Sequence, residues 1–212
     1  MSHQSYPNRQ SHRYKGFDYA SAGAYFVTFC VRYGNCWLGE IIDGEMILSD
    51  AGRAVEACWY QLPERYPTIG LDEFRIMPNH AHLVIWLQEA VGGPLAAPDP
   101  ANISKAVGGP LAAPGLNPGD TTGAASSPPT VNMNPRLDQV MRTYKSLSAI
   151  AVNACLRRRG QLWQRDYWDR IIRDEVELEN VRHYIRTNPT RWVDDQLHPD
   201  APPNKFNRWE NT

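Results

Sequence analysis

Short strand-like runs alternate with longer helix-like patterns along this chain, and their order restricts the folds open to it. Runs rich in β-branched and aromatic residues lie at 25–31, 36–42, 74–77, 82–87 and 167–172. Apolar residues spaced three and four apart predict helices that begin after Ser49, span 136–159, and run from Asp174 to Asn188. The order strand, strand, helix, strand, strand, helix, strand, helix predicts an α+β fold, with helices packed on a mostly antiparallel sheet.

Turn residues separate these segments. Tyr33-Gly34-Asn35 lies between the first two runs and predicts a hairpin that joins 25–31 to 36–42, and Asp43-Gly44 predicts another turn. Pro63 is expected to stop the first helix, and Asn188-Pro189 the last one.

A segment rich in proline and glycine divides the chain. AVGGPLAAP at 90–98 recurs at 106–114, and the residues that follow have no apolar period. Such a segment buries too little apolar surface to offset its ordering entropy, so we expect 89–135 to be a loosely held insert. The chain then divides into an N-terminal arm at 1–24, one catalytic domain at 25–88 and 136–192, the insert, and a C-terminal tail at 193–212.

Charge is distributed unevenly although the net charge is only -1. Residues 136–191 carry twelve Lys and Arg against seven Asp and Glu, and several of these basic residues alternate with aromatic ones. Cationic and aromatic side chains together suit single-stranded DNA, so Arg142, Lys145 and Arg165 are candidate DNA contacts, although many such residues are simply solvated.

No apolar segment is long enough to span a membrane, and the N-terminus has no secretory pattern. The four cysteines form no C-x-x-C pair, which favours a reducing compartment. We therefore expect a cytoplasmic protein, associated with the nucleoid if it binds DNA.

Two histidines separated by one residue, His80 and His82, stand at the start of the run 82–87. Alternate side chains of a strand share a face, so both imidazoles can point at one cation. Many metals accept this spacing, and such a pair can also be two polar strand residues. The following residues are strongly apolar, however, and histidines packed on such a strand need partners. We predict a metal site here, and Val84 excludes a third alternating histidine.

Tyr184 and Asn188 lie four residues apart in the last predicted helix and therefore share a face. A phenol with a pKa near ~10 becomes a phosphate nucleophile only when a cation or a base assists loss of its proton. Asn188 can add an oxygen ligand to that cation. The spacing equally allows Tyr184 to be a packing residue, and Tyr144 and Tyr167 are alternative tyrosines.

Four separated motifs resemble the REP-associated tyrosine transposases, single-tyrosine HUH transposases of the insertion sequence 200/605 type. They are NRQSHR at 8–13 with the FDY and YFVT that follow, MPNHAHLV at 77–84, LWQRDYWDR at 162–170, and YIRTNP at 184–189. The resemblance extends from residue 8 to residue 192, apart from the insert.

The resemblance implies a ferredoxin-like nuclease domain in which His80 and His82 are the HUH pair, Asn188 is the third metal ligand and Tyr184 is the nucleophile. It implies Mg²⁺ or Mn²⁺, and a substrate of single-stranded DNA that carries a hairpin from a repetitive extragenic palindrome. Attack by Tyr184 would leave a 5′-phosphotyrosine bond and a free 3′-OH.

The resemblance also concerns the N-terminal arm and the assembly. Arg9, Arg13 and Lys15 are expected to contact the hairpin. Relatives work as monomers or as homodimers, so both states stay open for this chain.

Two other functions stay open from the sequence. A catalytically idle regulator would bind hairpin DNA without forming a covalent adduct. A metal-dependent hydrolase of a small phosphoester would hydrolyse its substrate without covalent capture. Such an enzyme would lack a basic, aromatic surface.

Overall fold

The computed structural model describes residues 21–88, 132–202 and 204. The expected arm and insert lie almost wholly outside the described residues, as do Arg9, Arg13 and Lys15. The described elements follow in this order: β1 (Gly23–Cys30), η1 (Arg32–Gly34), β2 (Gly39–Ile42), β3 (Glu45–Leu48), α1 (Asp50–Tyr60), α2 (Leu62–Arg65), β4 (Ile69–Met77), β5 (His80–Leu87), α4 (Leu137–Cys155), β6 (Trp168–Ile172), α5 (Glu175–Thr187) and η2 (Pro189–Asp194).

Four strands form the main sheet, in the order β4-β5-β1-β6. Every neighbouring pair is antiparallel, and β1 lies between β5 and β6. The succession β1, α1, β4, β5, α4, β6 with this strand order is the ferredoxin-like arrangement. The predicted α+β fold class is therefore confirmed.

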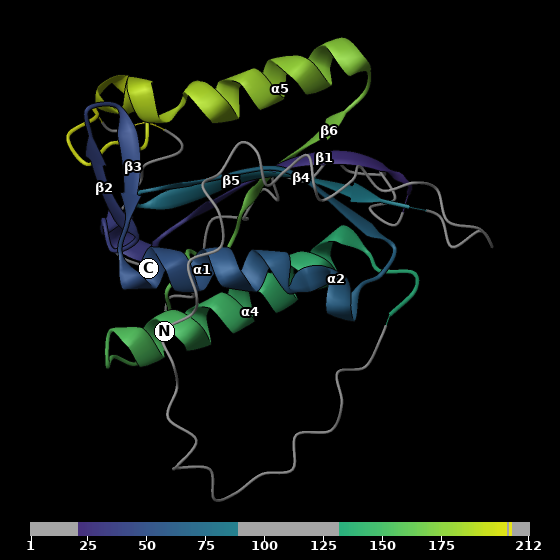
Figure 1. The fold of residues 1–212 in the computed structure, drawn as a ribbon, viewed down its shortest axis with the longest axis horizontal. Coiled ribbons are helices and arrows are strands. Elements are labelled where there is room, and N and C mark those ends of the chain that lie inside the picture. The colour runs from purple at the N-terminus through teal and green to yellow at the C-terminus, as the bar shows by residue number, and fades with distance from the viewer. Residues whose placement is uncertain (1–20, 89–131, 203, 205–212) are drawn as a thin grey trace, which may run out of the picture.

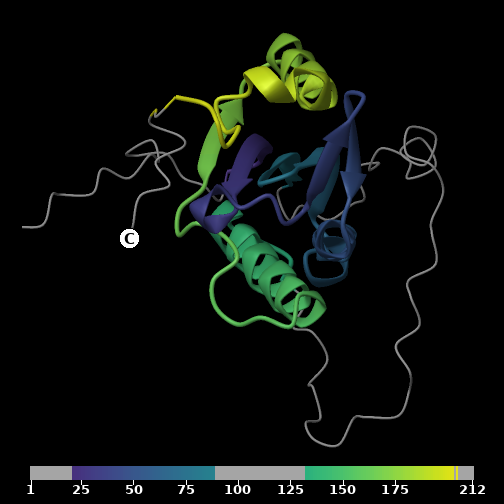
Figure 2. The ribbon, with the colours of Figure 1, turned by 90° about the vertical axis from the view of Figure 1, so that its left-hand side faces the viewer.

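Helices cover both faces of this sheet. Figure 1 shows α1 and α4 on one side and α5 on the other, and Figure 2 shows the same three layers from the end. Successive residues of a strand point to opposite faces. In β1, Tyr25, Val27 and Phe29 join the large apolar core under α1 and α4, whereas Ala24 and Phe26 face α5.

Side-chain caps begin two of the helices where the sequence predicts them. The Ser49 hydroxyl accepts a hydrogen bond from the amide of Gly52 at 3.1 Å, and the Asp174 carboxylate accepts one from the amide of Glu177 at 2.8 Å. Pro63 lies in the first turn of the short helix α2, which follows α1 directly. None of the helices in the described part of the chain is long and apolar enough to cross a membrane.

The predicted hairpin between 25–31 and 36–42 is wrong. Both edges of β1 are occupied, by β5 and β6, so β2 pairs with β3 in a separate two-stranded sheet. The connection of that hairpin is Asp43-Gly44, which has φ of 52° and 79°. Positive φ at both central residues is the two-residue turn that suits the twist of paired strands. Asp43-Gly44 was therefore the stronger hairpin signal, and β3 is the strand that the sequence analysis missed.

Candidate active site

His80 and His82 lie at the start of β5, and both rings face the layer beneath α5. The residues between and after them, Ala81 and Leu83, enter the core on the opposite face. His80 is 0% and His82 is 2% exposed, and their Nε2 atoms lie 3.1 Å apart. The alternation predicted from the sequence therefore brings both imidazoles to one point.

The Asn79 side chain determines which nitrogen of His80 carries the proton. Its amide nitrogen donates to the carbonyl oxygens of Gly34, at 3.3 Å, and Leu197, at 2.7 Å. The amide oxygen must then face Nδ1 of His80, 2.8 Å away, so that nitrogen is the donor. Burial lowers the pKa of His80 to about 3. The ring is therefore neutral near pH 7, and Nε2 presents a lone pair.

His82 is oriented in a similar way from the neighbouring strand. Nδ1 of His82 lies 2.8 Å from the hydroxyl of Thr28, the residue opposite it on β1. Burial, and then the neighbouring His80, lower the pKa of His82 well below its usual value, while Asp195 acts in the opposite direction. When the Thr28 hydroxyl accepts a hydrogen bond from Nδ1–H of His82, the Nε2 lone pairs of both histidines face one point. A cation stabilises this arrangement.

Tyr184 projects from α5 towards this pair. Its hydroxyl lies 3.4 Å from Nε2 of His82, and its ring meets the His82 and Phe26 rings edge-on. Burial, and then the charge of Asp195, raise the pKa of Tyr184 to about 12, although hydrogen bonding from Asn188 and the charge of Arg191 lower it. The phenol is therefore protonated near pH 7 unless a cation is close to it.

Asn188 ends α5 one turn after Tyr184, as the sequence predicts. It is 4% exposed, and its Oδ1 atom has no hydrogen-bond partner among the described residues. A buried amide oxygen without a partner is costly, and a metal ion is one group that would satisfy it. This unpaired oxygen makes Asn188 a suitable ligand, although its role stays a prediction.

Asp195 is the acidic group of the site that the sequence analysis missed. A carboxylate oxygen lies 3.9 Å from Nε2 of His80, and potential ligand atoms of His80, His82 and Asp195 all lie within 4.8 Å of one another. Two imidazole nitrogens and a carboxylate suit a divalent metal ion. Asp195 directly follows η2 in the segment 193–212 that we expected to be a tail. Its only sequence signal was the acidic pair Asp194-Asp195 close behind the last helix.

A cavity of about 420 Å³ opens in front of these residues. Its lining includes Thr28, His82, Tyr184, Asn188 and Asp195. A second hollow of about 690 Å³ adjoins it and shares Phe26 and Tyr184. Tyr184 therefore stands between two hollows and can be reached from both.

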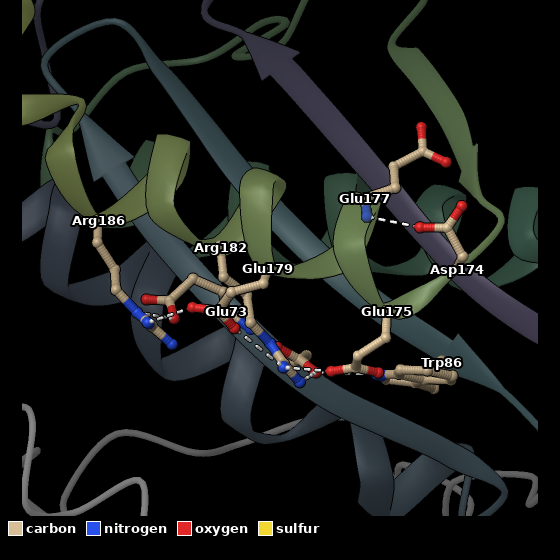
Figure 3. A network of polar contacts seen from close by, with 9 residues as sticks. Glu73, Trp86, Asp174, Glu175, Glu177, Glu179, Arg182 and Arg186 are labelled. Atoms are coloured by element: carbon tan, nitrogen blue, oxygen red, sulfur yellow. Dashed lines mark hydrogen bonds and ion pairs between the residues drawn. The ribbon is translucent and has the colours of Figure 1, made fainter.

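Ion pairs attach α5 to the edge strand β4 (Figure 3). Arg182 donates two hydrogen bonds to the Asp72 carboxylate, at 2.8 Å and 2.6 Å, and the indole of Trp86 donates a third at 2.9 Å. Arg186 donates to Glu73 at 2.7 Å. Asp72 and Glu73 lie where the register of β4 shifts against β5. The bulge therefore presents two carboxylates to the helix.

These ion pairs, together with the packing of Leu178, Val181 and Ile185 on the sheet, set which way Tyr184 points. At about 100° per residue, Arg182 and Arg186 project to one side of α5 and Tyr184 to the other. Burial raises the pKa of Asp72, but hydrogen bonds from Arg182 and Trp86 outweigh it and leave the pKa below its usual value. A charged Asp72 thus holds one side of the helix on β4 while Tyr184 faces His82.

The described DNA-contact candidates have different surroundings. Arg142 lies on α4, on the far side of the sheet from the histidines, and pairs with Asp138 at 3.2 Å. The Lys145 ammonium donates to the carbonyl oxygens of Gln164 and Arg165, at 2.6 Å and 2.8 Å, and burial lowers its pKa to about 8. The Arg165 side chain is exposed. DNA contacts by these three residues stay predictions, and the bonds of Lys145 give it a structural task.

Sequence comparison places the chain beside a bacterial relative. An uncharacterized protein of Haemophilus influenzae is 32% identical over 196 residues, which cover 91% of this chain and 94% of that protein. This chain belongs to the same family. The similarity to the Haemophilus protein thus extends over both segments of the domain, 25–88 and 136–192, that carry the site. No family model matches the chain.

Two solved structures are similar to parts of the fold. A REP-associated tyrosine transposase bound to a REP hairpin is 15% identical, with 86% of this chain and 74% of that chain covered and a TM-score of 0.49. A transposase-like protein of Deinococcus radiodurans is 11% identical, with 82% and 95% covered and a TM-score of 0.39. The fold assignment rests on the sheet topology, and the functional argument on the site.

Proposed function

We propose that this chain is a REP-associated tyrosine transposase, a metal-dependent enzyme that cleaves and rejoins single-stranded DNA at palindromic hairpins. The substrate class comes from the four motifs at 8–13, 77–84, 162–170 and 184–189 that resemble this family. The reaction class is argued from the site.

One observation carries the proposal. The Tyr184 hydroxyl lies 3.4 Å from Nε2 of His82, which itself lies 3.1 Å from Nε2 of His80. These atoms come from a helix and a strand separated by a hundred residues of sequence, so local periodicity does not bring them together. A nucleophile beside a pair of metal-ligating nitrogens is the arrangement that metal-assisted phosphoryl transfer needs.

Each residue then has a separate task. His80, His82 and Asp195, with Asn188, would hold a divalent ion, which when bound stabilises the phenolate and the charge that develops on the phosphate. The Tyr184 oxygen forms a bond to phosphorus while the bond from phosphorus to the 3′ oxygen breaks. The phenol proton leaves to solvent in the cavity, and the released 3′ oxygen takes up a proton.

The reaction exchanges one phosphoester bond for another, so the energy of the bond is conserved. A 3′-OH from a second DNA end can therefore attack the phosphotyrosine and release Tyr184, which rejoins the strands without any nucleotide cofactor. The carboxylate and amide oxygens of the site suit both Mg²⁺ and Mn²⁺, so both ions are to be tested.

The test is a denaturing gel of the purified protein with end-labelled, single-stranded palindromes from the flanking genomic DNA. We expect a covalent protein–DNA adduct that requires Mg²⁺ or Mn²⁺, disappears with EDTA, and is absent in Tyr184→Phe. Tyr60→Phe is the matched control, because Tyr60 is similarly exposed on α1, at 47% against 42%. This variant should form the adduct at the unaltered rate.

Two results would contradict the proposal. An adduct that persists in Tyr184→Phe would mean that another residue is the nucleophile. Tight hairpin binding by the unaltered protein with neither adduct nor cleavage, in either metal, would favour the catalytically idle DNA-binding regulator.

A further inference from the structure

Five arginines and two aromatic rings gather beside the His80 end of the sheet. We call them the basic-aromatic surface; its members are Arg32, Tyr33, Trp37, Arg157, Arg158, Arg159 and Arg165. They belong to η1, to the residues after it, and to the connection between α4 and β6. Figure 2 shows that connection running back from α4 to β6 beside η1.

Backbone hydrogen bonds join the two segments into one unit. The amide of Arg32 donates to the carbonyl of Leu162 at 2.7 Å, and the amide of Gln164 donates to the carbonyl of Cys30 at 2.8 Å. An isolated bridge pairs Val31 with Trp163. The backbone segments that carry these side chains are therefore fixed relative to each other, although they come from distant parts of the sequence.

Three of the five arginines are exposed and lack an acidic partner in the described part of the chain. Arg157, Arg159 and Arg165 are exposed, and none of them forms an ion pair with another residue in the described part of the chain. Asp166 is the acidic residue next to them in the sequence. Exposed guanidinium groups without acidic partners attract phosphates and bind them with the release of counterions.

Of the two rings, Tyr33 is exposed, whereas Trp37 is half-buried and packs against the core. Tyr33 is 46% exposed, with the guanidinium of Arg32 4.6 Å from its ring centre. Arg158 lies 4.0 Å over the ring of Trp37. Tyr33 and Arg157 adopt left-handed backbone conformations, with φ of 63° and 48°. Such conformations are unfavourable for residues other than glycine and concentrate at functional sites.

This surface adjoins the catalytic site through Asn79. The carbonyl of Asn79 accepts from the amide of Val31 at 2.7 Å, its side chain donates to Gly34 in η1, and its amide oxygen faces Nδ1 of His80. One residue thus separates the metal-ligating ring from the segment that carries Arg32 and Tyr33. A DNA strand on this surface would therefore lie beside the segment that positions His80.

We propose that the basic-aromatic surface binds the unpaired DNA strand next to the cleavage point, with phosphates on the arginines and a base on Tyr33. This inference rests on the proposed function for its substrate class. The exposed ring of Tyr33 favours a single strand over a duplex, because only unstacked bases can rest on it. An exposed ring beside several arginines also favours nucleic acid over an acidic protein, since a nucleic-acid strand offers bases and phosphates together.

The first test measures binding by fluorescence anisotropy over a range of salt concentrations. The probes are a labelled palindromic hairpin with an unpaired flank and the same hairpin without the flank. Arg157→Gln with Arg159→Gln should weaken binding of the flanked probe and lower its salt slope by about 1 per arginine. Binding of the bare hairpin should change little.

A matched double variant is Arg53→Gln with Arg65→Gln. Arg53 lies on α1 and Arg65 on α2, and neither belongs to the basic-aromatic surface or to the candidate DNA contacts. This pair removes the same charge and should leave the salt slope for the flanked probe unaltered. Equal losses from both pairs, or equal losses for both probes, would overturn the proposal in favour of general charge attraction or of duplex binding.

The second test is Tyr33→Gly. Glycine accepts a φ of 63° more readily than tyrosine, so the variant should melt no lower than the unaltered protein. It should nevertheless bind the flanked probe about tenfold more weakly, because it lacks the stacking ring. Unchanged affinity for the flanked probe would overturn the proposal that a base stacks on Tyr33.

Failure of the surface proposal can be distinguished from failure of the proposed enzyme function. If the arginine variants bind the flanked probe normally while the unaltered protein forms the Tyr184 adduct, the surface is wrong and the enzyme assignment holds. If the arginine variants lose affinity for the flanked probe while the unaltered protein forms no adduct, the surface proposal is supported and the assignment as an enzyme fails. An unaltered protein that binds neither probe would overturn the surface as well.

Discussion

The two faces of the main sheet are built from the same strands but stabilised differently. Beneath α1 and α4, the side chains of Val27, Phe29 and Leu83 lie in a large apolar core and are fully buried. Beneath α5, the same strands present Thr28 and the histidine pair, and ion pairs hold the helix to β4. The first face supplies stability. The second face buries polar groups, which are the groups that the proposed reaction requires.

His82→Ala should produce the largest effect on the α5 face. Removal of this proposed ligand should abolish detectable metal-dependent cleavage and weaken Mn²⁺ binding, measured by calorimetry. The melting temperature without metal should not fall greatly, because a buried imidazole contributes little apolar stabilisation. A variant that cleaves DNA with unaltered metal affinity would show that His82 is not a ligand.

Leu83→Ala is the adjacent change on the other face. Leu83 is fully buried in the core, so its truncation should lower the free energy of unfolding by about 2–5 kcal/mol. Denaturant unfolding measures this loss. Below the midpoint of unfolding, the folded variant should still bind Mn²⁺, and loss of metal affinity without loss of stability would contradict the division between the two faces.

Acid should destabilise the protein through the histidine pair. Burial lowers the pKa of His80 to about 3, below the usual value of 6.5 that applies in the unfolded chain. The unfolded state therefore binds more protons between these values, and stability is lost as the pH falls from 6.5 towards 3. The loss should be on the order of a few kcal/mol. In His80→Ala with His82→Ala, the free energy of unfolding should vary less over this window; an unaltered dependence would place the acid sensitivity elsewhere.

Arg182→Lys should have the smallest effect of the four. Lysine keeps the charge but not the paired hydrogen bonds to Asp72, so α5 should be held less firmly and global stability should fall by about 1 kcal/mol. The cleavage rate should fall more than DNA affinity, because the ion pair acts on the position of Tyr184. Arg53→Lys, at an exposed ion pair on α1, is the control. Equal losses of rate and affinity in Arg182→Lys would indicate a merely structural ion pair.

Local patterns were sufficient for most of the fold. Helix caps at Ser49 and Asp174, the turn at Asp43-Gly44 and the alternation through His80 and His82 depend on neighbouring residues, so they can be recognised in the chain. The wrong hairpin had a different cause. Whether the segment after β1 pairs with β1 depends on β5 and β6, which occupy both of its edges, and no local signal reports that occupation.

By itself, the sequence determined which side chains share a face, because periods of two and about 3.6 residues are local properties of strands and helices. That was enough to pair His80 with His82 and Tyr184 with Asn188. Only the tertiary structure decided that Asp195 joins the histidines, that Asn79 directs the His80 lone pair, and that Asp72 holds the helix of Tyr184. Asp195 and Asp72 lie far along the chain from their partners, and Asn79 is oriented by the distant carbonyls of Gly34 and Leu197, so these contacts follow from how the layers pack.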